Sequence, residues 1–338
     1  MLDSATRHRL FGVRDALEHP VVAGAPIVAG AALFAALVAI TVLTRAGRIG
    51  AETSRELLRR TFSWCVLAPL MLGPVLLGSA WVIAGVFLLS LFCYREYARV
   101  TGLFRMRLVG AAVALGIGLV TFAALDHWYG FFTALAPLGV ALIAVVAMAG
   151  DEPKGYVQRV ALGVLGFLLF GVGLGHLGFL ANDADYRPIL VLVVSAVQLN
   201  DVFAFLAGKA LGRRRLCRNT SPGKTVAGAL FSLAMTTTLV VLVGRLVFAE
   251  GAMSRWPNLL ALGAIASVSG QLGDLMLSSI KRDVGRKDTG RAIPGHGGLL
   301  DRFDSLLLAA PAIFHFLAYV RGIGDGQARR IFTGGGVP

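Results

Sequence analysis

The chain has 338 residues, of which 56% are hydrophobic and only 15% charged, and its mean hydropathy is +0.74. A soluble domain carries charges on about a quarter of its residues, so this composition argues against a soluble enzyme. The net charge of +13 comes from basic residues in short segments between apolar runs, which argues against a nucleic-acid partner. Three cysteines without a CxxC spacing argue against a disulfide framework and a zinc site.

The apolar runs are continuous, and several approach or exceed the length of about 18 residues that a membrane-spanning helix needs. A transmembrane β-barrel would instead show short alternating segments. We therefore predict an all-α polytopic membrane protein, a bundle of about ten transmembrane helices with a polar active-site cavity that faces the cytoplasm. The expected spans are residues 21–44, 64–93 as two helices, 108–125, 129–149, 160–181, 188–207, 226–248, 257–280 and 304–320.

The run from Trp64 to Cys93 is too long for one comfortable crossing and carries Gly78 in its middle. We predict two helices with a tight turn near Gly78, and a single kinked helix is the alternative. Ten spans place the basic loops on one side of the membrane, with the acidic loop 182–187 and both chain ends on the other. The basic loops are residues 45–60, 95–107, 209–224 and 281–302.

The sequence divides into three predicted parts. Residues 1–62 contain a polar segment, an additional first helix that is too long for a signal-peptide core, and a basic linker. Residues 63–322 form the main membrane domain. Residues 323–338 are a Gly-rich tail that we expect to be flexible.

A loop between the last two apolar runs, residues 278–304, combines basic side chains, aspartates and glycines. Basic side chains suit phosphate oxygens, glycines let the backbone approach a ligand, and aspartates can hold a hard cation such as Mg²⁺. His296 could contact a phosphate or orient a ligand, although a lone histidine in a loop is more often a hydrogen-bonding residue. The loop therefore indicates chemistry on a phosphorylated ligand beside the membrane.

Two predicted spans carry an aspartate, which is costly inside a membrane and indicates a face turned to the bundle interior or a wet cavity. Gln271, Asp274 and Ser278 share one face of their helix. Asp201, next to Asn200, lies near the end of another span. A structural polar contact between helices is the alternative for both aspartates.

Asp301 and Asp304 flank Arg302 at the start of the last span. Two carboxylates three residues apart can share a helix face, and with Asp274 they could form an oxygen-ligand site for a hard cation. The alternative for Asp304 is a carboxylate that interacts with the dipole at a helix N-terminus. We predict Asp274 and Asp301 as the metal ligands.

The stretch from Ser221 to Thr225, Ser-Pro-Gly-Lys-Thr, is similar to the end of a phosphate-binding P-loop. The full pattern needs a glycine where Arg218 stands and a strand before the loop, whereas a membrane helix precedes this stretch. We therefore reject a Walker A site. A lysine at a helix start, here Lys224, can still bind phosphate.

Together these motifs resemble the phosphatidate cytidylyltransferases, also called CDP-diacylglycerol synthases. The family pattern near the C-terminus is Ser, any residue, an aliphatic residue, Lys-Arg, four residues, Lys-Asp, then a Pro/Gly-His-Gly-Gly segment and Asp-Arg-x-Asp. The chain carries it without departure as Ser278, Ile280, Lys281-Arg282, Lys287-Asp288, Pro294 to Gly298, and Asp301 to Asp304.

Upstream elements also look like the family, and the whole resemblance runs from about residue 60 to 322. One departure is Ala227, which stands where the family often has Gln or Glu. The matching upstream elements are Asp201, Gly208-Lys209, Ser221 to Thr225, and Gln271 to Asp274.

The resemblance implies an all-helical, Mg²⁺-dependent membrane enzyme, as a homodimer, that converts CTP and phosphatidic acid into CDP-diacylglycerol and pyrophosphate. It implies a multi-pass protein of the cytoplasmic (inner) cell membrane with active-site loops on the cytoplasmic side, and it leaves room for a second cation. The phosphatidate phosphate is already anionic, so catalysis would rest on positioning and charge neutralisation. The implied site residues are Lys281, Arg282, Lys287, Asp288, His296 and Arg302 as catalytic groups, Asp201, Lys209, Ser221, Lys224, Thr225, Gly297 and Gly298 as substrate-binding groups, and Asp274 and Asp301 as metal ligands.

Two other interpretations stay open. One is a CTP-dependent enzyme on another lipid phosphate or on a polyprenol, either a kinase or a cytidylyltransferase, which its products would distinguish. The other is a membrane transporter, whose intramembrane polar residues would line a pathway through the bilayer. Here the polar residues gather near one membrane face beside basic loops, which favours an enzyme.

Overall fold

Ten helices are long and apolar enough to cross a membrane in the computed structural model, which describes residues 4–13, 15–290, 293, 297–322 and 330–334. The predicted all-α polytopic fold is confirmed. A short helix α1 (Ser4–Phe11) precedes the spans. The spans are α2 (Pro20–Arg45), α3 (Ala51–Leu77), α4 (Ser79–Thr101), α5 (Arg107–Leu125), α6 (Tyr129–Met148), Tyr156–Leu180 with α7 (Tyr156–Gly166) and α8 (Leu174–Leu180), α9 (Tyr186–Leu211), α10 (Val226–Val247), α11 (Trp256–Asp283), and Leu300–Arg321 with α12 (Leu300–Phe303) and α13 (Leu306–Arg321).

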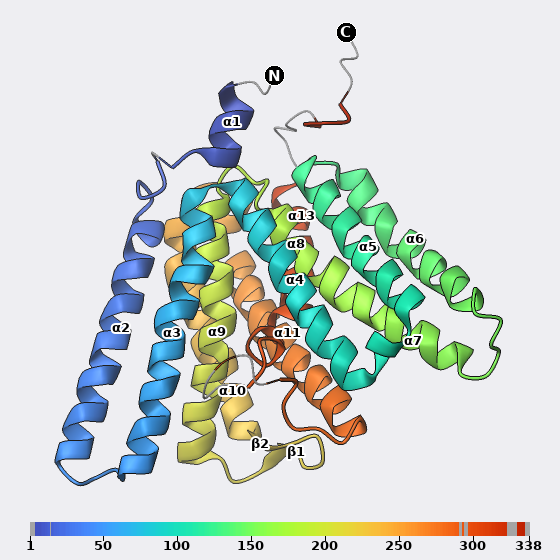
Figure 1. Cartoon of the computed structure of the whole chain (residues 1–338). Coiled ribbons are helices and arrows are strands. Elements are labelled where there is room, and N and C mark those ends of the chain that lie inside the picture. The colour runs from blue at the N-terminus through green and yellow to red at the C-terminus, as the bar shows by residue number, and fades with distance from the viewer. Residues whose placement is uncertain (1–3, 14, 291–292, 294–296, 323–329, 335–338) are drawn as a thin grey trace.

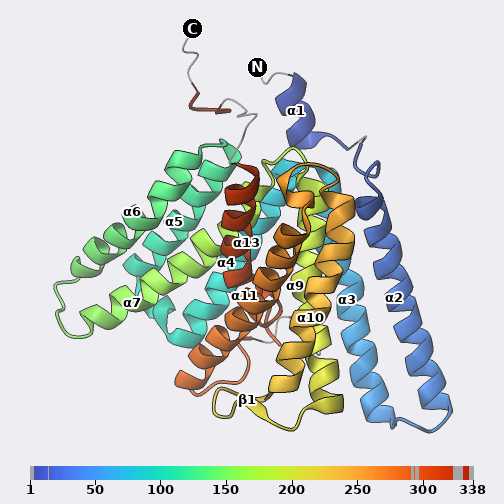
Figure 2. The same ribbon diagram turned by 180° about the vertical axis from the view of Figure 1, so that it is seen from behind.

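The helices form two groups that meet along α13 (Figure 1, Figure 2). In one group α9, α10 and α11 pack against one another, and α2 and α3 lie outside α9. In the other group α4 to α8 pack together, with α5 against α6 and α4 against α8. Helix α13 contacts both α11 and α8, so the last span joins the two groups.

The break between α3 and α4 lies at Gly78, whose φ of 131° favours glycine over any other residue. A Cβ there would also stand 2.3 Å from the carbonyl oxygen of Leu10, so α1 can approach only a glycine. The two-helix prediction is confirmed, and the single kinked helix is wrong. Helix α3 begins at Ala51 instead of Trp64, because the basic linker is itself helical and extends the short apolar stretch to a full span.

The second group of helices packs around Phe167, which is fully buried. It opens a π-helical stretch, Phe167–Gly173, between α7 and α8. A Cβ at Gly116 of α5 would stand 2.7 Å from the Phe167 ring, and one at Gly139 of α6 would stand 2.2 Å from it. Both helices therefore need glycine where the ring enters between them.

The two ends of the bundle differ in charge. The turn between α2 and α3, the β1–β2 hairpin and the link from α11 to α12 lie at one end, where the basic segments are (Figure 1). Helix α1 and residues 330–334 lie at the opposite end (Figure 1). The arrangement agrees with the predicted one, in which both chain ends lie opposite the basic loops.

The basic segment after α9 contains a small antiparallel hairpin, β1 (Arg215–Cys217) and β2 (Ser221–Thr225), where we expected a loop. Thr225 ends β2 and begins α10, because its extended backbone lets its hydroxyl accept the N–H of Gly228 at 3.1 Å. A strand therefore does precede a helix at the Ser-Pro-Gly-Lys-Thr stretch. It is a strand of five residues in a hairpin, and the glycine missing at Arg218 still argues against a Walker A site.

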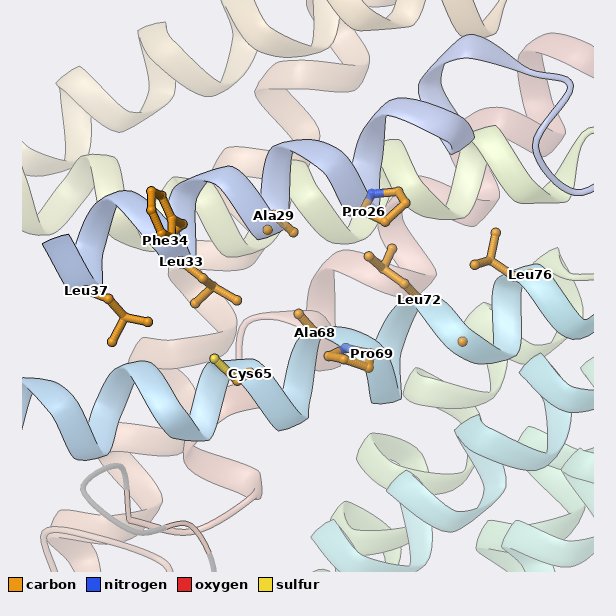
Figure 3. A pocket seen from close by; sticks show the side chains of 12 residues that line it. Pro26, Ala29, Leu33, Phe34, Leu37, Cys65, Ala68, Pro69, Leu72 and Leu76 are labelled. Atoms are coloured by element: carbon orange, nitrogen blue, oxygen red, sulfur yellow. The ribbon is translucent and has the colours of Figure 1, made fainter.

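Helix α2 stands at the outer edge of the bundle, and only 6% of its span is buried. An apolar groove of about 560 Å³ runs between α2 and α3 (Figure 3). Pro26, Leu33 and Leu37 of α2 and Cys65 and Leu72 of α3 are among the residues that line it. This surface suits hydrocarbon, as expected for an additional helix at the lipid boundary.

The end of the described chain contacts the turn between α5 and α6. Asp126, which is buried, accepts the backbone N–H of Phe332 at 2.5 Å and of Thr333 at 3.2 Å, and also the Thr333 hydroxyl. Arg330 lies over the Trp128 ring, 4.8 Å from its centroid. Residues 330–334 therefore have defined contacts within the segment that we expected to be flexible, and the rest of that segment lies outside the described residues.

Candidate active site

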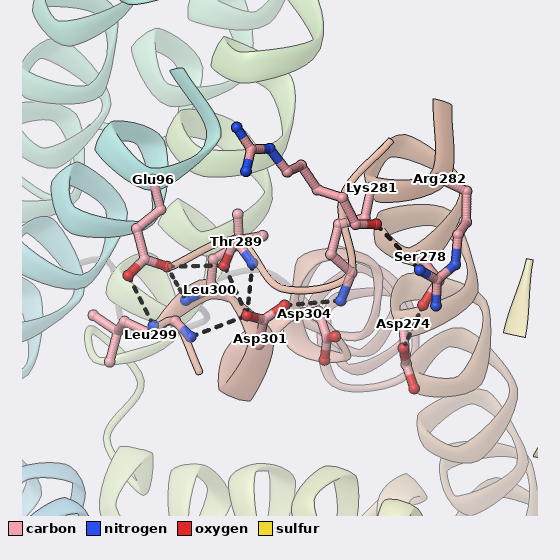
Figure 4. Close-up of polar contacts among 12 residues, drawn as sticks. Glu96, Asp274, Ser278, Lys281, Arg282, Thr289, Leu299, Leu300, Asp301 and Asp304 are labelled. Carbon is pink, nitrogen blue, oxygen red and sulfur yellow. Dashed lines mark hydrogen bonds and ion pairs between the residues drawn. The ribbon is translucent and has the colours of Figure 1, made fainter. Parts of the chain in front are cut away.

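The predicted site residues come from five segments at the basic end of the bundle: the end of α9, strand β2, the end of α11, the link from α11 to α12, and the start of the last span. Figure 4 shows Asp274, Lys281, Asp301 and Asp304 in one polar region, with the link from α11 to α12 passing beside them. We call the described residues of this link, 284–290, 293 and 297–299, the α11–α12 loop. His296, a predicted catalytic residue, lies outside the described residues.

Asp301 is held from several directions (Figure 4). Its Oδ1 accepts from the Lys281 ammonium at 2.8 Å. Its Oδ2 accepts the backbone N–H of Thr289 at 2.9 Å and of Gly298 at 3.0 Å, and the Thr289 hydroxyl lies at 2.9 Å. The Lys281 and Asp301 side chains are only 11% and 5% exposed, so this ion pair is kept away from water and its carboxylate is fixed in orientation.

Lys224 and Asp274 form a second ion pair, which is more open. The Lys224 ammonium lies 2.7 Å from Asp274 Oδ2, and the Ser278 hydroxyl donates to Asp274 Oδ1 at 3.2 Å. The two charged side chains are 21% and 24% exposed. Strand β2 thus presents its lysine to α11, where a phosphate could reach it.

Two more carboxylates lie next to this pair. The Ser305 hydroxyl donates to Asp201 Oδ2 at 2.8 Å, and the Ser305 N–H donates to Asp304 Oδ1 at 2.8 Å. The charges of Asp201, Asp274 and Asp304 act on one another. A Cβ at Gly273 would stand 2.7 Å from the Asp304 carbonyl oxygen, so glycine lets α11 approach the last span closely here.

A buried polar layer supports these carboxylates from inside the bundle. Asn200, beside Asp201, accepts the hydroxyls of Thr236 at 3.0 Å and Ser267 at 2.6 Å. The Gln271 amide in turn donates to Ser267 Oγ at 3.0 Å. The layer ties α9, α10 and α11 together, next to Asp201 and about one turn from Asp274. Asn200 and Gln271 thus make structural contacts between helices.

The remaining predicted residues surround this region. Lys209, Arg282, Lys287 and Asp288 are exposed, and Arg282 donates to the Thr220 carbonyl at 3.3 Å, which links α11 to the hairpin. Nε of Arg302 is buried without a hydrogen-bond partner among the described residues. Ser221 is half-buried in β2, and Thr225 is buried as the N-cap of α10. Gly297 has a φ of 85°, and a Cβ there would stand 3.1 Å from Asp301 Oδ2.

The chemistry of the site fits a hard cation that shares its ligands with a substrate. Among the residues that the structure describes, no three His, Cys, Asp or Glu side chains are grouped so as to hold a metal. Mg²⁺ is usually held by one or two carboxylates together with substrate phosphates, so a complete protein cage is not required. Asp274 is a half-open carboxylate, and Asp301 already accepts at both of its oxygens.

Sequence reasoning missed Glu96, near the end of α4. Its carboxylate accepts the backbone N–H of Leu299 at 3.0 Å and of Leu300 at 2.8 Å, and the Thr289 hydroxyl at 3.1 Å (Figure 4). The signal in the sequence is an acidic residue at the boundary of a span and a basic loop. Nothing local in the sequence indicates its partners, because they are about two hundred residues away.

A model of the cytidylyltransferase family matches residues 58–320 of the chain. The chain is 29% identical to the uncharacterized protein YnbB of Escherichia coli over 298 residues, which is 86% of this chain and 97% of that protein. It is 28% identical to a phosphatidate cytidylyltransferase of Staphylococcus saprophyticus over 250 residues, 73% of this chain and 94% of the relative. A phosphatidate cytidylyltransferase of Staphylococcus haemolyticus is 38% identical over 142 residues, 42% of this chain and 54% of the relative.

Proposed function

This chain belongs to the cytidylyltransferase family, and we propose that it transfers the cytidylyl group of CTP to phosphatidic acid, giving CDP-diacylglycerol and pyrophosphate. It is a nucleotidyltransferase and a multi-pass membrane protein. Two relatives named phosphatidate cytidylyltransferase support phosphatidic acid as the substrate. The uncharacterized protein YnbB matches more of this chain than these two relatives do. The identity of the lipid substrate is therefore the part of the proposal that most needs a test.

One observation carries the proposal: there are two lysine–aspartate pairs, Lys224–Asp274 and Lys281–Asp301, at the basic end of the bundle. Asp274, Lys281 and Asp301 lie in one polar region (Figure 4). CTP and phosphatidic acid are both rich in phosphate charge. Ammonium groups can neutralise this charge while fixed carboxylates orient them. The same end of the bundle borders the bilayer, from which a lipid phosphate can enter.

The proposed reaction needs no strong general base, because a phosphatidate oxygen is already anionic. That oxygen attacks the α-phosphorus of CTP and forms a new P–O bond. The bond from the α-phosphorus to the oxygen that bridges to the β-phosphate breaks, and pyrophosphate leaves with that electron pair. Lys224 and Lys281 would stabilise the charge that builds up on the phosphoryl oxygens, while the exposed Arg282 and Lys287 would attract the CTP phosphates.

Mg²⁺ is the proposed cofactor, with Asp274 and Asp301 as its protein ligands. When bound, it would neutralise the phosphate charge and stabilise the leaving pyrophosphate. Asp274 is half-open beside Lys224, which suits a ligand that also contacts substrate phosphate. Oδ2 of Asp301 already accepts two backbone N–H groups. Asp301 would therefore bind the metal through the remaining lone pair of Oδ1, the oxygen that also accepts from Lys281.

We further propose that the basic end faces the cytoplasm, where CTP is present and where basic loops are retained. The protein would lie in the cytoplasmic membrane, as a homodimer. A cysteine placed at exposed Lys287 should react with a membrane-impermeant maleimide only after the cells are opened. Labelling in intact cells would contradict this orientation.

The reaction is tested with purified protein in detergent, given phosphatidic acid, CTP labelled at the α-phosphorus, and Mg²⁺. We expect lipid-extractable label and pyrophosphate from the wild type and neither from Asp301→Asn. Formation of CDP without labelled lipid would instead indicate a CTP-dependent lipid kinase. A wild type that turns over no lipid phosphate would contradict the proposed function.

A further inference from the structure

Glu96 connects the two groups of helices at the site. It lies on α4, yet its carboxylate accepts the backbone N–H groups of Leu299 and Leu300, where the α11–α12 loop enters α12. Each carboxylate oxygen takes one of these N–H groups, Oε1 from Leu299 and Oε2 from Leu300. Backbone N–H groups at the start of a helix have no partner within the helix, so a carboxylate there is favoured by both hydrogen bonding and the dipole.

The loop backbone makes room for this carboxylate at two glycines. A Cβ at Gly290 would stand 2.9 Å from Glu96 Oε1, and a Cβ at Gly298 would stand 2.4 Å from Glu96 Oε2. Real Cβ contacts are not this short, so a side chain at either glycine would displace the Glu96 carboxylate from this position. The sequence predicted Gly298 as a substrate-binding residue. The contact with Glu96 is a second, independent explanation for glycine at this position.

Thr289 joins Glu96 to Asp301. Its hydroxyl lies 3.1 Å from Glu96 Oε2 and 2.9 Å from Asp301 Oδ2. A hydroxyl has one proton, so it can donate to only one of the two carboxylates at a time. Asp301 also accepts the backbone N–H groups of Thr289 and Gly298. Glu96 thus holds the same piece of backbone that orients Asp301.

We propose that Glu96 is a positioning residue: it clamps the α11–α12 loop to α4 so that Asp301, with Lys281, keeps its orientation toward the reacting phosphates. The inference rests on the proposed function for its effect on catalysis. Glu96 acts through the Leu299 and Leu300 amides and Thr289, and not by contact with a substrate. A residue of α4, in the second group of helices, is therefore part of a site whose motifs all lie in the second half of the chain.

Glu96→Gln is the decisive variant, because an amide can accept at one oxygen but presents an NH₂ group to the other backbone N–H. We expect kcat to fall about 10- to 100-fold, since hydrogen bonds to a charged group contribute about 1.5–3 kcal/mol. The KM for CTP should change little, because the loss is one of orientation. Glu96→Asp keeps the charge on a side chain one methylene shorter and should recover part of the rate.

Hydrogen–deuterium exchange gives a readout that does not depend on turnover. In Glu96→Gln the peptide that contains Leu299 and Leu300 should exchange faster, while peptides from α5 and α6 should not change. Glu56→Gln is the matched control, because Glu56 is an exposed glutamate paired with Arg60 on α3. It should leave both kcat and the exchange of the loop unchanged.

Three results would overturn the inference: wild-type kcat in Glu96→Gln, unchanged exchange at Leu299 and Leu300, or faster exchange throughout the bundle, which would make Glu96 a general stability residue. Failure of the proposed function is distinguishable. If the wild type turns over no lipid phosphate but the exchange of the loop still rises in Glu96→Gln alone, the clamp stands and the assigned reaction falls.

Discussion

At the basic end of the bundle, Asp201, Asp274 and Asp304 lie within electrostatic reach of one another. Among these three, Asp274 forms an ion pair with Lys224. At the opposite end one cation serves both acidic residues: Arg321 lies 3.1 Å from Asp183 and 3.2 Å from Asp185. Like charges kept close together cost free energy unless something neutralises them. The opposite end therefore uses its charges to hold segments together, whereas the basic end keeps an arrangement that favours a ligand.

Two acids at the opposite end illustrate how the protein's own groups act on a carboxyl pKa. Burial acts to raise the pKa of the Asp126 carboxyl, but the Thr333 hydroxyl, the N–H groups of Phe332 and Thr333, and the charge of Arg330 outweigh it and hold the pKa below its usual value. For Asp183 burial prevails over Arg321, and its pKa is raised. These contacts come from the protein itself, so the acids of the opposite end have partners without a substrate.

The largest effect is expected at the buried pair of the site. Lys281→Met would leave the Asp301 charge buried without its cation, and breaking such a pair costs about 3–5 kcal/mol. We expect kcat/KM to fall by more than about 100-fold, together with a lower unfolding temperature. Activity and thermal unfolding are measured side by side, with Lys154→Met, a change at an exposed lysine, as the control. A stable variant with normal turnover would remove Lys281 from the site.

The open pair should separate activity from stability. Asp274→Asn leaves Lys224 able to reach water, because both side chains are about a quarter exposed, so the unfolding temperature should hardly change. Turnover should fall about 10- to 100-fold, and the Mg²⁺ concentration for half-maximal rate should rise. Titration of the rate with Mg²⁺ tests this. An unchanged Mg²⁺ requirement would argue against Asp274 as a ligand.

At the opposite end the expected effect is on stability alone. Arg321→Gln removes the cation between Asp183 and Asp185 and should lower the free energy of unfolding by about 1 kcal/mol or less, since such partly exposed pairs are weak. The turnover number should stay at the wild-type value. A loss of turnover without a loss of stability would break the contrast between the two ends.

The smallest effect concerns residues 330–334. Because the pKa of Asp126 is lower in the folded protein, its contribution to stability is present above the ordinary carboxyl pKa and is lost as the pH falls through the lowered value. Asp126→Asn at neutral pH should imitate that loss. Deuterium exchange of the 330–334 segment, corrected for the intrinsic effect of pH, should rise in both cases while turnover at neutral pH is kept. No change in exchange would show that the carboxylate does not hold the segment.

Local patterns predicted most of the fold and only part of the site. Each span depends on its own hydropathy, and Gly78 marks its turn because no other residue suits that backbone. The sequence did not predict the start of α3 at Ala51, because Arg55 and Arg59 are typical of a basic loop. A helix can also carry such residues where it leaves the bilayer. The β1–β2 hairpin was not predicted, because its strands are short and mostly polar.

The sequence motifs predicted which residues belong to the candidate site, but not which of them form ion pairs. The sequence predicted Asp274 and Asp301 as partners around a metal, whereas the structure pairs each with a different lysine. Their metal role stays a prediction. Glu96 and the Asn200 layer connect separate helices, and such contacts depend on packing that no single stretch of sequence records.

The contact between Glu96 and Leu299 joins residues 203 positions apart, and this has a consequence for how the protein is made. Spans enter the membrane in order during synthesis, so α4 is in place long before the ribosome has translated its partners. Until then the carboxylate lies at the end of a span without those hydrogen bonds, where an ionisable group is costly. The candidate site is complete only when the last span has been inserted, and a chain interrupted before residue 299 would carry most of the bundle yet lack the contacts that hold Asp301.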